Sequence, residues 1–500
     1  MRDIKTREIK QLLWSRNIKL VLAGIFVAEI FSFLSFYFES LRPFIFLILA
    51  LAFLLICLYR FELGVYIALI EIFVGSLGSL FFGEIAGVNL SIRMILWIIL
   101  LAVWIIKYLP RIKKAKIFRS KYLYFLIPLF LLIAWGLLSG YLNNHTLSNI
   151  FFDFNGWLYF ALILPFYEIF LTRRNSFLVL LQLFLASAIW LTIKTLALLF
   201  VFSHNLNGVM SVVYEWIRDT GVGEITRMPD TFTRIFFQSH IFVLLSFFLL
   251  IFLLNKYLTN KKVSRKNLFL VLFILTSFQA VVLLSFSRSF WLGAFFGSLV
   301  LLGLVWWKYG LKRAFLNLGI ILLTGVLSLV LLTLIVKIPI LDSTAQFNTA
   351  DSLKDRAKSF SGEAAVSSRW ALLPKLWGEI KEAPILGQGF GATITYHSSD
   401  PRVLEETING EYTTYAFEWG WLDIWLKLGL LGLIFYLALL IKIIIDSWCS
   451  KSLKNSSLNA FLITGLIIIS VINFFTPYLN HPLGIGYLIF SLGLIDKLSD

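Results

Sequence analysis

Charged residues and cysteines are scarce in this 500-residue chain. Only 14% of its side chains are charged and 59% are hydrophobic, whereas soluble domains carry about 25% charged residues. The composition therefore excludes an ordinary soluble domain and indicates an integral membrane protein. The two cysteines, Cys57 in an apolar run and Cys449 in a basic loop, are too few for a disulfide framework or a zinc site.

Motifs for metals and dinucleotides are also missing. The five histidines have no metal-ligand spacing, and the run GQGFG at 387–391 lacks both a preceding strand and the full dinucleotide fingerprint. We therefore predict no metal and no cofactor, and we interpret GQGFG as a glycine-rich helix exit. His397, in a long polar segment, is a further candidate for recruitment to a site.

Long apolar runs dominate what is present. A bilayer-spanning helix needs about 17–25 such residues, and segmenting the chain by this rule predicts an all-α polytopic membrane protein with about 14 transmembrane helices. The predicted spans lie near 18–36, 43–59, 64–82, 90–108, 122–140, 153–171, 177–202, 236–254, 268–286, 289–307, 316–338, 429–446, 459–477 and 483–496.

The net charge of +16 is explained by its distribution. Lys and Arg gather in 109–121, 172–176, 255–267, 308–315 and 447–458, which all fall inside if the amino terminus is cytoplasmic. Cytoplasmic loops carry this excess of basic residues. We therefore predict that both termini are cytoplasmic and that the basic segments contact membrane lipids, with no nucleic acid as partner.

The same topology places two polar segments outside, 203–235 and 339–415. We predict transmembrane helices 1–11 in 1–338, a large, partly helical external loop (339–415) with an interfacial helix in 339–428, and helices 12–14 in 429–500. Part of the external loop shows helical periodicity. Its predicted apolar face contains Trp370, Leu373, Leu376, Trp377 and Ile380.

Three motifs occur in order between about 280 and 440. SFSRSFWLG surrounds Arg288; Arg369 precedes an amphipathic helix; and a run with Gly429 and Gly432 enters the next span. The helix after Arg369 ends in a turn with Pro384, Gly387, Gly389 and Gly391, and the last motif also has Gly420, Trp421, Leu422 and Asp423. Together they resemble the bacterial O-antigen ligase and O-antigen polymerase superfamily. The resemblance implies a GT-C-like architecture and a membrane glycosyltransferase.

A permanent cation at membrane depth needs a partner or a wet cavity, since it costs about 2.5–3.5 kcal/mol on insertion scales. A guanidinium binds phosphate oxygens in a bidentate manner, so we predict that Arg288, with Ser287 and Ser289, binds a lipid diphosphate. The resemblance implies that Arg288 and Arg369 both contact the donor diphosphate. Snorkelling of Arg288 to the interface and an ordinary solvated Arg369 are the alternatives. Arg227 and Arg234 are further candidates for this cluster, or else loop anchors.

The family's His-Asn pair falls on Glu418 and Trp419, so the histidine associated with acceptor activation is replaced by a carboxylate. We predict Glu418 as the general base; the alternative is an interfacial carboxylate that pairs near Lys427. Trp421 is a candidate for stacking on sugar, although aromatic residues also gather at membrane interfaces.

These observations predict an enzyme of the bacterial cytoplasmic (inner) membrane with its active site facing the periplasm or exterior. We expect a polysaccharide polymerase that transfers glycan from polyprenyl diphosphate to a sugar hydroxyl of another lipid-linked repeat unit, inverting and independent of metal. A flippase and a chain-length regulator are expected protein partners.

Other functions stay open at this stage. The missing histidine favours a polymerase over an O-antigen ligase, which would transfer finished glycan to lipid A core. A protein O-oligosaccharyltransferase is a second alternative. A non-enzymatic lipid-linked sugar transporter is the third, because Glu71, Glu168 and Lys194 lie in predicted spans.

Overall fold

The computed structural model is mostly helical, which confirms the predicted helical character. It describes residues 15–85, 88–172, 176–206, 208–227, 233–258, 264–338, 364–398, 403–404, 407, 409–449 and 457–499. The first part of the predicted external loop, 339–363, and some basic segments, such as 259–263 and 450–456, lie outside the described residues.

Ten helices of the described part are long and apolar enough to cross a membrane, or eleven if a bent pair is one span. This confirms a multi-pass protein, whereas the predicted count of about fourteen is not reproduced. The ten are α2 (Arg16–Tyr37), η1 (Glu39–Leu41) with α3 (Arg42–Tyr59), α5 (Ile92–Tyr108) with most of η2 (Leu109–Lys114), α6 (Leu123–Leu142), α9 (Ser176–Ser203), α11 (His240–Leu258), α12 (Arg265–Leu284), α13 (Arg288–Tyr309), α14 (Leu311–Lys337) and α18 (Gly420–Cys449).

Three predicted spans correspond to shorter or less apolar helices. The predicted span 64–82 is the 14-residue α4 (Phe61–Val74), followed by a turn in which Ser76 and Gly78 have positive φ. The last two spans are α20 (Ser457–Ile472) and α21 (Pro482–Ser499). The bent pair is α7 (Leu147–Phe154) with Trp157–Thr172, which comprises η4 (Trp157–Leu162) and α8 (Ile163–Thr172).

The core is centred on α11, in which 17 of 19 residues are buried. It packs against α9, α12 and α20. By contrast α3 is equally apolar but buries only Phe46, Phe53 and Cys57. An apolar helix with so little protein around it is suited to face lipid.

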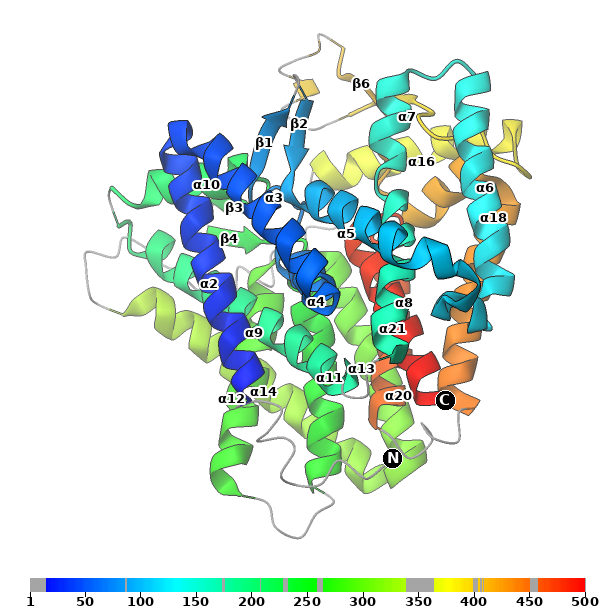
Figure 1. Cartoon of the computed structure of the whole chain (residues 1–500). Helices are drawn as coiled ribbons and strands as arrows, with labels where there is room; N and C mark the ends of the chain where they lie inside the picture. The colour runs from blue at the N-terminus through cyan, green and yellow to red at the C-terminus, as the bar shows by residue number, and fades with distance from the viewer. Residues whose placement is uncertain are drawn as a thin grey trace.

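Three two-stranded antiparallel hairpins depart from the all-α prediction. They are β1–β2 (Phe82–Ile85, Val88–Ser91), β3–β4 (Glu224–Arg227, Thr233–Phe236) and β5–β6 (Ile394–His397, Glu411–Thr414). All three lie at one end of the bundle with α7, α10 (Met210–Asp219) and α16 (Ala364–Glu382), opposite the start of α2 (Figure 1). The described parts of both predicted external segments thus share one end of the molecule.

Charges inside the bundle are paired with each other. Lys194 Nζ on α9 lies 2.6 Å from Glu29 Oε2 on α2, and Arg93 Nε on α5 lies 2.7 Å from Glu71 Oε2 on α4. Glu168 accepts the backbone N–H of Lys116. A buried ion must be paired or hydrogen-bonded to be tolerated at this depth. The two ion pairs therefore link α9 to α2 and α5 to α4.

Candidate functional site

The turn before α13 presents Arg288 at the first position of that helix. Phe286 adopts a positive φ of 49°, which reverses the chain between α12 and α13. Ser287 occupies the N-cap position, but its hydroxyl lies 3.0 Å from the hydroxyl of Ser289 rather than on a helix N–H. A helix N-terminus with a guanidinium and two hydroxyls is suited to an anion.

Arg234 is held against this same turn. Its Nε donates to the carbonyl of Ser285 at 2.8 Å, and its guanidinium lies over the ring of Phe236 and 3.6 Å from Glu224. Arg227 is the last residue of β3, paired across the hairpin with Thr233, and its side chain is outside what the structure describes. The structure therefore brings Arg234 to the Arg288 turn.

Arg369 and Glu418 form an ion pair through Arg369 Nε and Glu418 Oε2. Trp419 Nε1 also donates to the carbonyl of Arg369 at 3.0 Å, and its ring contacts Trp370. Lys427 is engaged elsewhere, as described below, so the partner of Glu418 is Arg369.

The helix that carries Arg369, α16, is positioned by a small core. Leu372, Leu376 and Ile380 are buried against the β5–β6 hairpin and the start of α18. Leu373 is only half-buried, and Trp370 and Trp377 are 58% and 41% exposed. The predicted face was therefore wrong by part of a turn, because the two tryptophans flank the buried stripe and contact Trp419 and Trp425 edge to face.

The segment after α20 connects the two arginine-bearing elements. Thr476 Oγ1 lies 3.2 Å from Ser289 Oγ at the start of α13, and the neighbouring Phe475 ring contacts Trp419. Two residues on, Tyr478 packs against Phe290. This contact chain joins the Arg288 turn to the Arg369–Glu418 pair.

A buried cluster of charged residues, which was not predicted, surrounds Lys427 on α18. Lys427 Nζ pairs with Asp153 on α7 and with Asp423 one turn earlier on α18. Asn480 donates to Asp423, and the N–H of Gly391 donates to Asp153 at 2.8 Å. The i,i+4 spacing of Asp423 and Lys427 was the available sequence signal. Asp153 lies 274 residues from Lys427 and had no such signal.

The GQGFG run packs as a helix exit. Gly387 and Gly389 have positive φ, and a side chain on Gly389 would lie 2.2 Å from the backbone N of Gly140. Gln388, Phe390 and Gly391 donate their N–H groups to Leu426, Gly136 and Asp153. These amides are occupied by protein acceptors and are not presented to a phosphate.

Two other candidate site residues, Trp421 and His397, are in contact with neighbouring protein groups. Trp421 is 9% exposed, donates to the carbonyl of Ser470 and contacts Tyr436 and Phe474. His397 contacts the carbonyl of Asn409 within the β5–β6 turn. In the described part no three His, Cys, Asp or Glu residues are grouped to hold a metal.

No role was predicted for His481, which precedes α21. Its side chain is exposed, yet the surrounding protein and the positive charges of Lys427 and Arg93 lower the pKa of its ring to about 4. The imidazole is therefore neutral at physiological pH.

Comparison with known proteins finds a family match within the second half of the chain. Residues 268–437 match the protein family described as O-antigen ligase, which confirms the resemblance drawn from the motifs. No curated protein matches the chain. The matched range includes Arg288, Arg369, Glu418 and Lys427.

Proposed function

Because residues 268–437 form a domain of the O-antigen ligase family, we propose that the protein is a polymerase of cell-surface polysaccharide. The donor is an oligosaccharide on polyprenyl diphosphate, and the acceptor is a sugar hydroxyl of another lipid-linked repeat unit. The observation that supports this proposal best is the contact chain between the Arg288 turn and the Arg369–Glu418 pair.

In the proposed reaction the acceptor oxygen attacks the anomeric carbon while the bond from that carbon to the diphosphate oxygen breaks. Polyprenyl diphosphate leaves, and the configuration inverts. Arg288 and Arg369 neutralise the charge that develops on the leaving group, and such electrostatic stabilisation is the largest single term in many enzymes. The site faces the exterior of the cytoplasmic membrane in this proposal.

Glu418 receives the acceptor's proton. Its carboxylate is paired with Arg369. A donor diphosphate competes for the same guanidinium, since bidentate pairing suits phosphate as well as carboxylate. Donor binding thereby releases Glu418 to act as the base, so acceptor activation follows donor binding.

The paired charges of the bundle do not support a transporter. Glu71, Glu168 and Lys194 each have a partner within the protein, whereas a transport path would align charges along a central cavity. An O-antigen ligase remains the second candidate, because the matched family carries that description.

Glycan length in cells that lack the endogenous protein tests the proposal. Wild type should restore a ladder of repeats. Arg288→Ala and Arg369→Ala should leave single repeats, since loss of one such donor costs about 10²–10³ in rate. Arg265→Ala, at the opposite end of the α12–α13 hairpin, is the matched control and should behave as wild type when membrane levels are equal.

Glu418→Gln separates two roles of the carboxylate. A base cannot be replaced by an amide, so activity should fall as far as in the arginine variants, whereas a residue that only holds Arg369 should tolerate the isosteric change. If single repeats never accumulate and full-length polymer stays on its polyprenyl carrier, the protein is a ligase.

A further inference from the structure

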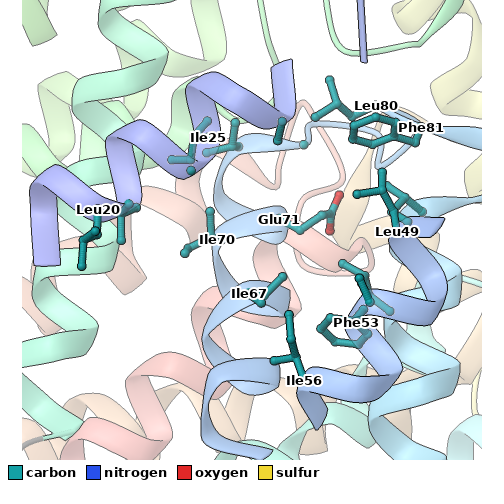
Figure 2. Close-up of a pocket in the computed structure, with 18 residues that line it drawn as sticks. Leu20, Ile25, Leu49, Phe53, Ile56, Ile67, Ile70, Glu71, Leu80 and Phe81 are labelled. Atoms are coloured by element: carbon teal, nitrogen blue, oxygen red, sulfur yellow. The ribbon is translucent and has the colours of Figure 1, made fainter. Parts of the chain in front are cut away.

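A cavity of about 470 Å³ opens between α2, α3, α4 and α5, away from the candidate site. Apart from Glu71, each of its lining residues is apolar or glycine. Figure 2 shows Leu20 and Ile25 on one side, Leu49, Phe53 and Ile56 on the other, and Glu71 projecting between them. Glu71 pairs with Arg93 through Oε2, while its Oε1 has no hydrogen-bond partner among the described residues. The rest of the wall offers a hydrocarbon surface.

The position of this groove identifies its class of occupant. α2 and α3 are candidate membrane spans with few buried residues, so they border the bilayer. Unfilled apolar space next to lipid is occupied by hydrocarbon, because a buried water needs about 2–4 polar partners and Glu71 is the one polar residue among the described residues of the wall. The occupant is therefore a lipid chain.

Arg42 indicates a phosphate site at the end of the groove that is close to the β1–β2 hairpin. Arg42 lies on the α3 face that also carries Phe46, Leu49, Phe53 and Ile56, since these positions recur at helical spacing. Leu49, the first of these to line the groove, is about 10 Å along the axis from Arg42. Arg42 Nη2 lies 3.4 Å from the exposed carboxylate of Glu39, and the guanidinium rests on the ring of Phe82. Its Nε is buried and has no hydrogen-bond partner among the described residues, so a phosphate would add a partner for Nε and compete with Glu39.

The lipid is not the glycan donor, because packed side chains separate the groove from Arg288. Next to the groove, Ser76 lies 3.2 Å from Ser239, and Tyr478 donates to the residue before Ser239. The Tyr478 ring contacts Phe290 in the first turn of α13. All four of these residues are buried. A donor with its diphosphate at Arg288 would have to cross or go around this packed layer to place its tail in the groove.

We propose that the α2–α5 groove is a binding site for a glycerophospholipid, with one acyl chain between α2 and α3 and the phosphate on Arg42. The site is separate from the proposed reaction. It fixes the two most peripheral helices of the amino-terminal half.

The test uses the full chain in vesicles that contain a phosphatidylglycerol with a photoactivatable acyl chain. Crosslinked peptides are quantified, and the yield on α2, α3 and α4 is divided by the yield on α14, which is exposed to lipid but lines no part of the groove. Gly24→Phe places a ring in the groove, since Gly24 lines it and a Cβ there would meet no atom within 4 Å. We expect the ratio to fall about tenfold.

Matched variants control for general effects. Gly319→Phe on α14 also enters open space and should leave crosslinking of α2–α4 unchanged. Arg42→Gln should lower the ratio, whereas Arg60→Gln at the other end of α3 should not. An unchanged ratio in both Gly24→Phe and Arg42→Gln overturns the proposal. So does preferential capture of a photoactivatable polyprenyl phosphate in a parallel sample, whatever the glycan assay shows.

Discussion

At the scale of single residues, the Lys427 cluster has the largest expected effect on stability. Lys427→Leu leaves Asp153 and Asp423 buried without their cation, and breaking a buried pair in this way costs about 3–5 kcal/mol. Thermal unfolding of the purified protein should show a large loss of stability. Lys442→Leu is the control on the same helix, since Lys442 is 35% exposed and its partner Asp446 also pairs with Lys121. Its loss should cost about 0–1 kcal/mol. Equal melting of the two variants would refute a stabilising cluster.

His481 predicts a dependence of stability on pH. Because its folded-state pKa is lowered to about 4, the unfolded chain binds the proton more tightly than the folded protein does. The stabilising contribution is complete above the unfolded pKa of about 6.5 and is lost as pH falls from there through about 4. Between pH 7.5 and 4.5 the melting temperature should fall more steeply with pH for wild type than for His481→Gln. Parallel curves would show that His481 does not contribute.

At the scale of elements, α18 consists of two helical pieces that meet at Gly429. Its backbone there is non-helical, with φ 70° and ψ −179°, a region that is essentially restricted to glycine. The first piece, from Gly420, is a short helix just before the predicted twelfth span, and its position at the membrane interface stays a prediction. It carries Asp423 and Lys427, and it begins directly after the Arg369–Glu418 pair.

Gly429→Ala should therefore displace the first piece of α18. A methyl group would lie 2.1 Å from the carbonyl oxygen of Ile385, and the backbone strain adds about 1–3 kcal/mol. We expect lower thermal stability and loss of the repeat ladder. Gly303→Ala in α13 meets no atom within 4 Å and should be neutral. A Gly429→Ala protein with wild-type melting and ladder would contradict this role of the break.

At the scale of the whole molecule, hydropathy predicted a multi-pass helical protein correctly because apolar run length is a direct requirement of the bilayer. Hydropathy placed the end of α4 too late in the chain, since the hydropathy window averages over Ser76 and Gly78, where the chain already turns. The three hairpins were missed because strands of four residues leave too little alternation to detect.

The site was predictable to different extents. Motif order located the elements with Arg288, Arg369 and Glu418, but the Arg369–Glu418 pair and the contact of Arg234 with the Arg288 turn depend on tertiary structure. The Lys427–Asp153 pair joins positions far apart in the chain. A single sequence carries no signal for such a pair, because pairing over long separations follows from packing.

The pair of Glu29 on α2 with Lys194 on α9 also affects how the chain folds during its synthesis. The two residues are separated by 165 positions, and each is costly to leave alone in lipid. At a synthesis rate of about 5–20 residues per second, α2 waits roughly 10–30 s before its counter-ion emerges. During that interval Glu29 needs a temporary partner, such as water at the insertion machinery or a chaperone helix, so the first helix reaches its final place only after much of the chain has been translated.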